Sequence, residues 1–319
     1  MKDDSDIVSL ARHIATFFYG DVTGVTRIAS NNNYVFRLNL GNNLKSKVIK
    51  IGRTQSNEGL QREQQVMVAL YNRGFDVPSI EFSQEDASFG IPFTIMPFIE
   101  GLSIYEVSTL EPSAIGTAYE LLGAFMNRLS RIDAMSIPGV ALIDDVRRDA
   151  EIAWTESHAE LLKHRRCTSR LVEIYEHSRD LWGDPERFWC LTHGDSLQLL
   201  TDGKDTFSVI DWEAASVGHP LGESGYFLMS HGFWIYLQKQ KGLSVYPEWH
   251  SRLLKGFLGA TGMTTGQLAA MHILGTSSCI DEALAMSARN LSKTDDFFSF
   301  IEDEDAKFVA SCRSENEGK

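Results

Sequence analysis

Apolar positions in the N-terminal part of the chain predict an antiparallel sheet with helices. Apolar residues at helical spacing predict helices at Ile7–Tyr19 and Gly59–Arg73. Short β-branched and aromatic runs predict five strands, which are Val22–Ala29, Tyr34–Leu40, Lys47–Ile51, Ser79–Ser83 and Phe93–Met96. The order of three strands, a helix and two strands suits an antiparallel sheet with one helix packed on it.

From Pro112 onward the pattern becomes mostly helical. The predicted helices are Ala114–Arg131, Val146–Lys163, Thr168–Trp182, Gly222–Lys239, Glu248–Thr261, Thr265–Asn290 and Asp295–Cys312. Apolar runs at Phe188–Leu191 and Phe207–Ile210 predict two strands, which a turn at Asp202–Asp205 joins. The segment Pro97–Gly101 interrupts the pattern, so we expect an N-lobe at residues 1–97 and a helical C-lobe at 98–319. The fold class is therefore α+β and bilobal.

Length and composition restrict the class of protein. The chain has 319 residues, more than one typical core, with 43% hydrophobic and 23% charged residues, as in globular proteins. No run of apolar residues is long enough to span a membrane, and the acidic N-terminus does not resemble a secretory signal. The four cysteines form no C-x-x-C pair. We therefore expect free thiols, no membrane partner and a cytoplasmic location.

The net charge is −13. This charge argues against nucleic acid and anionic membranes as partners, and it is compatible with a cationic substrate. Acidity can also serve solubility alone.

Two aspartates at the ends of predicted strands carry the most specific signal. One lies in His193-Gly194-Asp195 and the other in Ile210-Asp211-Trp212-Glu213. Phosphoryl transfer uses such a pair, because one carboxylate orients a hydroxyl and the other holds Mg²⁺ on nucleotide phosphates. The chain lacks the G-x-S-x-G elbow of hydrolases, the H-E-x-x-H zinc motif and the G-x-G-x-x-G dinucleotide motif.

With these motifs the chain resembles the aminoglycoside phosphotransferase and choline kinase superfamily, small-molecule kinases with a protein-kinase-like fold. The resemblance implies that Asp195 is the catalytic base and that Asp211 binds Mg²⁺. It further implies that Lys50 contacts the phosphates of ATP or GTP and that Glu63 pairs with Lys50. Asn32 and Asn33 would lie over the phosphates, although a simple hairpin turn is an equal alternative.

The segment Phe93–Gly101 resembles the strand and linker that hold the purine in this superfamily. The Pro97 carbonyl would accept a hydrogen bond from the adenine amino group, and the Ile99 amide would donate one to the ring. Met96 would form an apolar wall beside the base. Because backbone atoms make these contacts, ATP and GTP both remain candidates.

One residue of the superfamily motif is absent. The asparagine five places after the catalytic aspartate falls at Leu200, and no asparagine occurs from Ser196 to Ile210. Gln198 is the only carboxamide in this loop and is the substitute candidate for the metal. The alternative is a pseudokinase, a nucleotide-binding or scaffolding protein with an impaired metal site.

The molecule that accepts the phosphoryl group is the feature that the sequence determines least. We expect a hydroxylated, cationic small molecule, with antibiotic-type alcohols foremost. Acidic residues on the predicted helices, Glu223, Asp281 and Glu282 among them, are candidates for its pocket, although for any single one of them a solvated helix face is the favoured interpretation.

Overall fold

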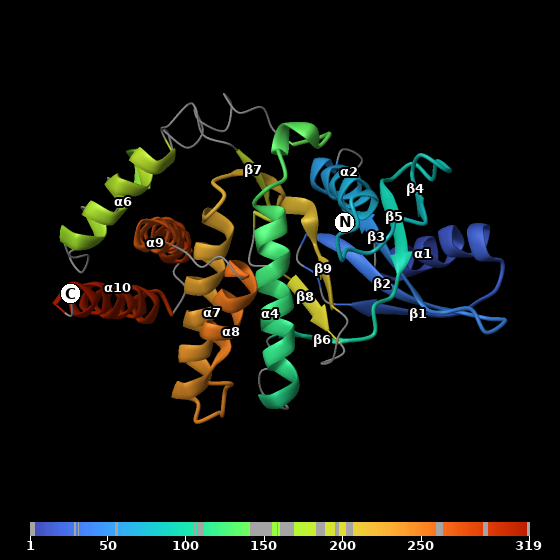
Figure 1. Ribbon diagram of the computed structural model, residues 1–319. Coiled ribbons are helices and arrows are strands. Elements are labelled where there is room, and N and C mark those ends of the chain that lie inside the picture. The colour runs from blue at the N-terminus through green and yellow to red at the C-terminus, as the bar shows by residue number, and fades with distance from the viewer. Residues whose placement is uncertain are drawn as a thin grey trace. The chain divides into compact units, whose positions relative to one another are not determined.

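The computed structural model describes residues 4–28, 30, 32–54, 57–104, 106, 112–140, 155–157, 159, 169–182, 189–194, 198–201, 207–259, 264–289 and 293–317. The chain forms two compact units (Figure 1). The first, here called the sheet unit, comprises Met1–Ile104, Ile137–Val140 and Gln198–Ala215. The second, the helical unit, comprises Tyr105–Ser136, Ala141–Leu197 and Ser216–Lys319. The predicted lobe boundary at residues 97 and 98 stays a prediction.

The sheet unit is built on a five-stranded sheet with the order β1-β2-β3-β5-β4. Its strands are β1 (Val22–Ile28), β2 (Asn33–Leu40), β3 (Lys47–Gly52), β4 (Phe82–Ser83) and β5 (Phe93–Pro97). All neighbouring strands are antiparallel, as predicted. The predicted strand at Ser79–Ser83 is shorter in the structure, because the chain joins the ladder opposite Ile95 only at Phe82.

Helix α1 (Asp4–Tyr19) packs on one face of this sheet. The core between them contains Ile7, Ala11, Ile14 and Ala15 from α1 and Phe36, Leu38, Ile49, Ile51, Phe93 and Ile95 from the sheet. Side chains alternate between the two faces of a strand, so Lys50 projects away from the face that Ile49 and Ile51 share with α1. The sequence pattern of β3 thus directs one lysine to the opposite face.

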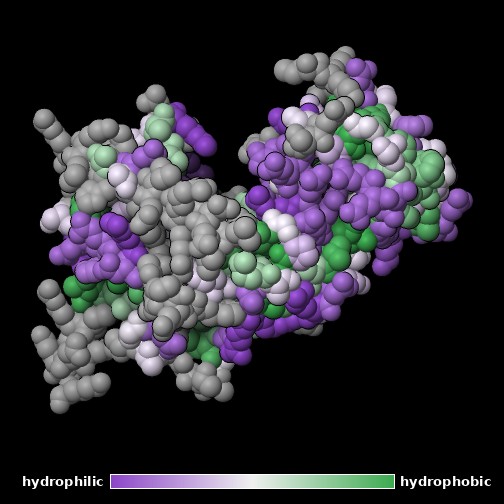
Figure 2. All heavy atoms as spheres, turned by 90° about the horizontal axis from the view of Figure 1, so that it is seen from above, coloured by the Kyte–Doolittle hydropathy of each residue, from purple (hydrophilic) through white to green (hydrophobic). Residues whose placement is uncertain are grey.

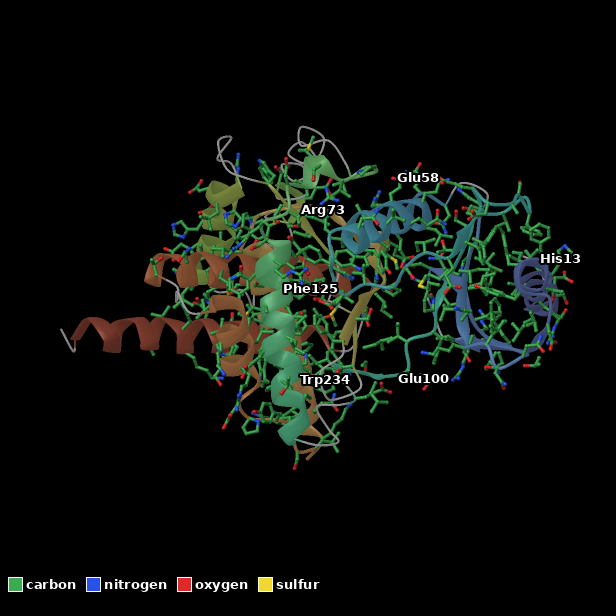
Figure 3. The ribbon with its side chains drawn as sticks, turned by 45° about the vertical axis from the view of Figure 1, so that its right-hand side comes forward. His13, Glu58, Arg73, Glu100, Phe125 and Trp234 are labelled. Carbon is green, nitrogen blue, oxygen red and sulfur yellow. The ribbon has the colours of Figure 1, made fainter. Side chains whose placement is uncertain are left out.

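Helix α2 (Glu58–Asn72) lies on that opposite side, and Figure 3 marks its two ends by Glu58 and Arg73. Asn57 caps its N-terminus by accepting a hydrogen bond from the Leu60 amide at 3.0 Å. The side-chain amide of Gln64 donates to the Phe93 carbonyl at 2.8 Å and to the Thr94 hydroxyl. These bonds fasten α2 to β5.

Two smaller sheets correct the predicted pairing of the motif strands. Strand β9 (Phe207–Ile210) pairs with β8 (Gln198–Thr201), which pairs in turn with β6 (Leu102–Ser103). Strand β7 (Cys190–Thr192) pairs instead with β10 (Ser216–Gly218). The prediction that the runs before Asp195 and Asp211 form one hairpin was therefore wrong. No strand was predicted at Gln198–Thr201, and β8 takes the place beside β9 that the prediction gave to β7.

The helical unit contains α4 (Pro112–Leu129), α6 (Ser169–Trp182), α7 (Gly222–Gln240), α8 (Trp249–Leu258), α9 (Thr265–Ala288) and α10 (Thr294–Glu317). Short 3₁₀ turns occur at Ala134–Ser136 here and at Trp212–Ala214 (η2) in the sheet unit. Most of the predicted helix at Val146–Lys163 lies outside the described residues. A Cβ atom on Gly225 of α7 would lie 2.2 Å from the Met271 carbonyl oxygen of α9, so glycine permits this close crossing.

Hydrophilic residues cover much of the coloured surface in Figure 2, with hydrophobic residues gathered in separate patches. In the part of the chain that the structure describes, no helix is both long and apolar enough to cross a membrane.

Candidate active site

Lys50 is the centre of a buried ion-pair network in the sheet unit. Its Nζ lies 2.7 Å from Glu63 Oε1 and 2.6 Å from Asp211 Oδ1. One ammonium group therefore joins β3, helix α2 and the residue that follows β9. The structure thus brings together Lys50, Glu63 and Asp211, as the sequence predicted. Their roles toward a nucleotide and a metal ion stay predictions.

Burial and neighbouring charges shift the pKa values of Lys50 and Glu63 in opposite directions. Burial alone would lower the pKa of Lys50, but the carboxylates of Glu63 and Asp211 outweigh it and raise that pKa. Burial also raises the pKa of Glu63, and the nearby Lys50 ammonium only partly offsets this rise. The side chain of Glu63 is 1% exposed and that of Asp211 is 42% exposed, so water reaches only the second carboxylate. Lys50 is therefore a permanent cation beside one buried and one accessible acid.

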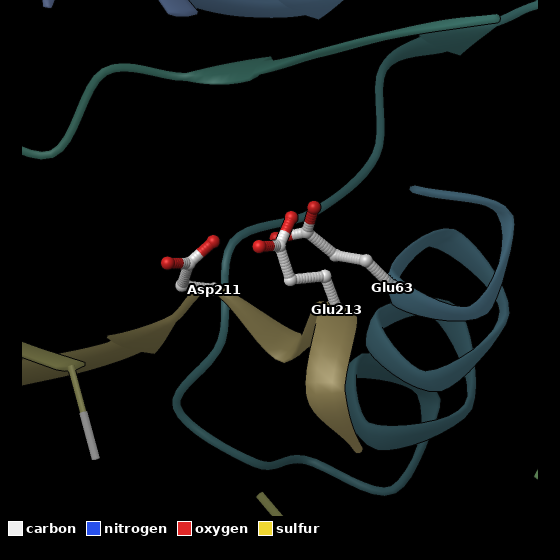
Figure 4. Close-up of side chains that lie close together, drawn as sticks. All are labelled: Glu63, Asp211 and Glu213. Carbon is white, nitrogen blue, oxygen red and sulfur yellow. The ribbon is translucent and has the colours of Figure 1, made fainter. Parts of the chain in front are cut away.

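The backbone at Asp211 has an unusual conformation, with φ of 72° and ψ of 49°. This left-handed region is rare for residues other than glycine, although aspartate tolerates it better than most. Trp212, which follows, is fully buried, and its indole N–H donates to the Val209 carbonyl at 3.2 Å. The anchored tryptophan holds the turn in which Asp211 and Glu213 both point toward Glu63 (Figure 4).

Glu213 connects this turn to the loop between β1 and β2. Asn32 donates to its Oε1 and Asn33 donates to its Oε2, each at 2.5 Å. In the structure, both asparagines that were predicted to lie over the phosphates therefore donate hydrogen bonds to the Glu213 carboxylate. Their phosphate contacts stay a prediction.

Three carboxylates converge at this position. Glu63, Asp211 and Glu213 each offer an oxygen atom, and these atoms lie within 4.8 Å of one another. Mg²⁺ is a hard cation that requires oxygen ligands, so this donor set fits it. Sequence reasoning assigned no role to Glu213, although its position two residues after Asp211 was a visible signal.

Gln198 and Leu200 lie on β8, where the register places them opposite Ile210 and Ser208. Leu200, at the superfamily's asparagine position, is thus a strand residue whose side chain has no oxygen. Gln198 lies across from the residue that precedes Asp211. Its role as a metal ligand stays a prediction.

The predicted purine-binding segment follows β5. Met96 is buried within the strand, with 4% of its surface exposed, and Pro97 pairs in register with Lys47. Ile99 lines a cavity of about 580 Å³ in the sheet unit, together with Phe98, Glu100, Leu200 and Phe207. Of the three predicted purine contacts, only Ile99 lines this cavity.

Asp195 lies outside the described residues, but the two residues before it are described. His193 is fully buried, and its backbone amide donates to Glu223 Oε2 at 2.9 Å. Gly194 has a φ of 79°, in the left-handed region that favours glycine. Glu223, in the first turn of α7, was a candidate for the acceptor pocket, and the structure directs one of its oxygens to the motif backbone instead.

A model of the phosphotransferase enzyme family matches residues 24–258 of this chain. Among curated proteins, the chain is 23% identical over 261 residues to human acyl-CoA dehydrogenase family member 11, covering 70% of this chain and 33% of that protein. It is 25% identical over 186 residues to mouse acyl-CoA dehydrogenase family member 10, covering 55% of this chain and 17% of that protein. The chain therefore spans a third or less of the length of these relatives.

Solved structures share the fold. A macrolide 2′-phosphotransferase from Brachybacterium faecium has a TM-score of 0.56 and 15% identity, covering 93% of this chain and 98% of that chain. An amicoumacin kinase in complex with AMP-PNP and Ca²⁺ has a TM-score of 0.59 and 16% identity, covering 95% and 96%. An ethanolamine kinase from Plasmodium vivax has a TM-score of 0.57 and 13% identity, covering 98% and 90%. These similarities confirm the predicted protein-kinase-like α+β fold.

Proposed function

The chain belongs to the phosphotransferase enzyme family, which confirms the predicted resemblance, and we propose that it transfers the γ-phosphoryl group of ATP or GTP to a hydroxyl group of a small molecule. The observation that most directly supports this proposal is the contact of the buried Lys50 with both Glu63 and Asp211. Phosphoryl transfer in protein kinases needs this combination of a lysine, its helix glutamate and a cation-binding aspartate.

On the nucleotide side, Lys50 binds phosphate oxygens, and Glu63 keeps the ammonium group in place. Asp211 and Glu213 would hold Mg²⁺, which neutralises charge on the phosphates when it is bound. Because the transition state is loose, positioning and charge stabilisation account for most of the rate acceleration. The asymmetry in exposure supports this division of roles, since the buried Glu63 can serve Lys50 while the accessible Asp211 serves the cation.

On the acceptor side, Asp195 accepts a hydrogen bond from the hydroxyl group and orients it for attack. The segment that carries Asp195 is held by Glu223, which accepts the His193 amide. The left-handed Gly194 then turns the chain directly before the catalytic residue. These contacts fix the backbone at His193 and Gly194, the two residues before the proposed base.

Nucleotide binding provides the first test. We expect ATP or GTP with Mg²⁺ to raise the melting temperature of the parent protein, as ligands that bind only the folded state do. Asp211→Asn should lose the Mg²⁺-dependent part of this rise, whereas Asp180→Asn, a matched change at an exposed aspartate of α6, should keep it. No stabilisation of the parent by either nucleotide would contradict the proposal.

We propose further that the acceptor is cationic. A cavity of about 630 Å³ runs along α7 within the helical unit. Its lining combines aromatic, acidic and basic residues, which include Tyr236, Trp249, Asp303, Glu304, Lys239 and Lys307. Aromatic faces and carboxylates attract a cation. The two lysines balance the two carboxylates, and Lys307 already contacts Glu304 at 2.6 Å, so an amine of low charge with an apolar body fits better than a polycation.

Two carboxylates that the sequence proposed for the acceptor are engaged elsewhere in the helical unit. Tyr175 donates its hydroxyl to Asp281 Oδ1 at 2.8 Å, and Tyr226 donates to Glu282 Oε2 at 3.2 Å. Burial raises the pKa of Asp281 to about 6, so this carboxyl is still mostly ionised at pH 7. Each of these carboxylates therefore already has a tyrosine hydroxyl as a hydrogen-bond partner within the helical unit.

The acceptor proposal is tested by phosphate transfer from radiolabelled ATP and GTP to a panel of alcohols. The panel should contain amino alcohols, aminoglycosides, macrolides, neutral sugars and hydroxy acids. Transfer to amino alcohols in preference to their uncharged analogues is the expected result. Transfer to sugars or hydroxy acids with no amine accepted would reject a cationic acceptor.

The position of Leu200 favours a second candidate, a nucleotide-binding pseudokinase. The superfamily's asparagine would supply an oxygen ligand there, and the β8 strand presents a leucine instead. The variant Leu200→Asn separates the two candidates. If the parent binds nucleotide without transfer and Leu200→Asn gains transfer, the pseudokinase is the better description.

A further inference from the structure

A line of hydrogen bonds connects the N-terminus of α2 to the carboxylate of Glu213. The Leu60 amide donates to Asn57 Oδ1 at 3.0 Å, and Asn57 Nδ2 donates to Asn33 Oδ1 at 2.6 Å. Asn33 Nδ2 then donates to Glu213 Oε2 at 2.5 Å. Asn33 is 2% exposed, so this line is shielded from water at its middle member.

The direction of every bond in this line follows from its two ends. A backbone N–H can only donate and a carboxylate can only accept. Asn57 must therefore turn its oxygen to Leu60 and its NH₂ group to Asn33. Asn33 must likewise turn its oxygen to Asn57 and its NH₂ group to Glu213. An asparagine side chain accepts through its oxygen and donates through its NH₂ group, whereas an ionised aspartate only accepts, so aspartate cannot replace asparagine at either position.

We propose that Asn33 and Asn57 are positioning residues that set the orientation of Glu213 and thereby the affinity of the site for a divalent cation. The proposal rests on the proposed function only in taking the cation to bind at Asp211 and Glu213. Asn32 donates to the other carboxylate oxygen of Glu213 at 2.5 Å, so each oxygen accepts a hydrogen bond from an asparagine.

These two hydrogen bonds to Glu213 are compatible with a cation bound to the same carboxylate. Each carboxylate oxygen has two lone pairs and can accept one hydrogen bond while it coordinates a metal ion. Without the amides, Glu213 would be repelled by Glu63 and Asp211, whose oxygens lie within 4.8 Å of its own. Outer-shell groups that orient a metal ligand typically contribute about 10- to 100-fold to metal affinity.

Two variants break the line in different ways. Asn33→Asp removes the donor to Glu213 and places a second carboxylate beside it. Asn57→Ser keeps a residue that caps helices well but removes the NH₂ group that reaches Asn33. Asn72→Asp, a matched change at an exposed asparagine at the end of α2, is the control.

Cation affinity is measured directly, by electron paramagnetic resonance titration with Mn²⁺, with and without AMP-PNP. We expect Asn33→Asp and Asn57→Ser to weaken Mn²⁺ binding about 10- to 100-fold, and Asn72→Asp to leave it unchanged. In Asn57→Ser, nucleotide affinity without the cation should stay near that of the parent, because Asn57 has no predicted contact with the phosphates. An unfolding midpoint of Asn57→Ser close to that of the parent shows that the helix cap is kept.

Parent-like Mn²⁺ affinity in both folded variants, or no Mn²⁺ binding by the parent, would overturn the proposal. The result of the Mn²⁺ titration can be distinguished from the result of the phosphate-transfer assay that tests the proposed function. If the parent transfers phosphate to no acceptor but its Mn²⁺ affinity still depends on Asn33 and Asn57, the proposed function fails and the positioning role stands.

Discussion

Replacing Lys50 by methionine tests the electrostatics of the site in isolation from any substrate. The change removes the cation that Glu63 contacts at 2.7 Å and Asp211 at 2.6 Å. Removing one partner of a buried ion pair typically costs about 3–5 kcal/mol of folding free energy. Asp211 is 42% exposed and can be hydrated, whereas Glu63 is 1% exposed. We therefore expect a loss near the lower end, about 3 kcal/mol at neutral pH.

The loss should depend on pH, because Glu63 without Lys50 must be protonated or remain as a buried charge. Burial already raises the pKa of Glu63 in the parent, and removal of the ammonium raises it further. The folded variant then binds more protons than the unfolded chain above the unfolded pKa of about 4.3. Its stability is accordingly greatest in acid and falls by up to about 1.4 kcal/mol per pH unit as pH rises toward the folded pKa of Glu63.

Urea unfolding at pH 5 and pH 8, followed by tryptophan fluorescence, measures this loss, since the fully buried Trp212 belongs to the sheet unit. Lys45→Met, at an exposed lysine that precedes β3, is the control and should change stability little. The double variant Lys50→Met with Glu63→Gln should recover part of the stability and lose the added pH dependence. An equal loss at both pH values, or no recovery in the double variant, would refute the reasoning.

Four further outcomes are expected. Asp195→Ala should lower phosphate transfer about 10²- to 10⁴-fold in a kinetic assay with little change in nucleotide affinity. Gln198→Ala should weaken Mg²⁺ binding, because it removes the carboxamide predicted to replace the missing asparagine, as judged by Mg²⁺ titration of activity. Glu223→Leu removes the acceptor of the buried His193 amide and should destabilise the fold by about 1–3 kcal/mol in urea unfolding. Burial lowers the pKa of His231 to about 3, so stability is lost as pH falls below about 6.5, and His231→Phe should reduce that loss in thermal melts at pH 4 and 7.

Local sequence pattern determined much of the sheet unit. The alternation in Val48-Ile49-Lys50-Ile51 places a single lysine on the face opposite the apolar pair, and that follows from the two-residue period of a strand. The helical spacing around Glu63 predicted α2 within one residue at each end. The motifs at Asp195 and Asp211 likewise indicated a phosphotransferase, because those residue types have a specific chemical use.

Pairing between distant segments was decided only by the tertiary structure. Strand β7 pairs with β10 and not with β9, since an apolar run predicts a strand but does not specify its hydrogen-bonded partner. The role of Glu223 as acceptor for the His193 amide depends on how the start of α7 packs. Glu213, Asn33 and Asn57 form one line only because η2 packs against the first turn of α2, and side-chain amides acquire a fixed direction from partners that the chain supplies far away in sequence.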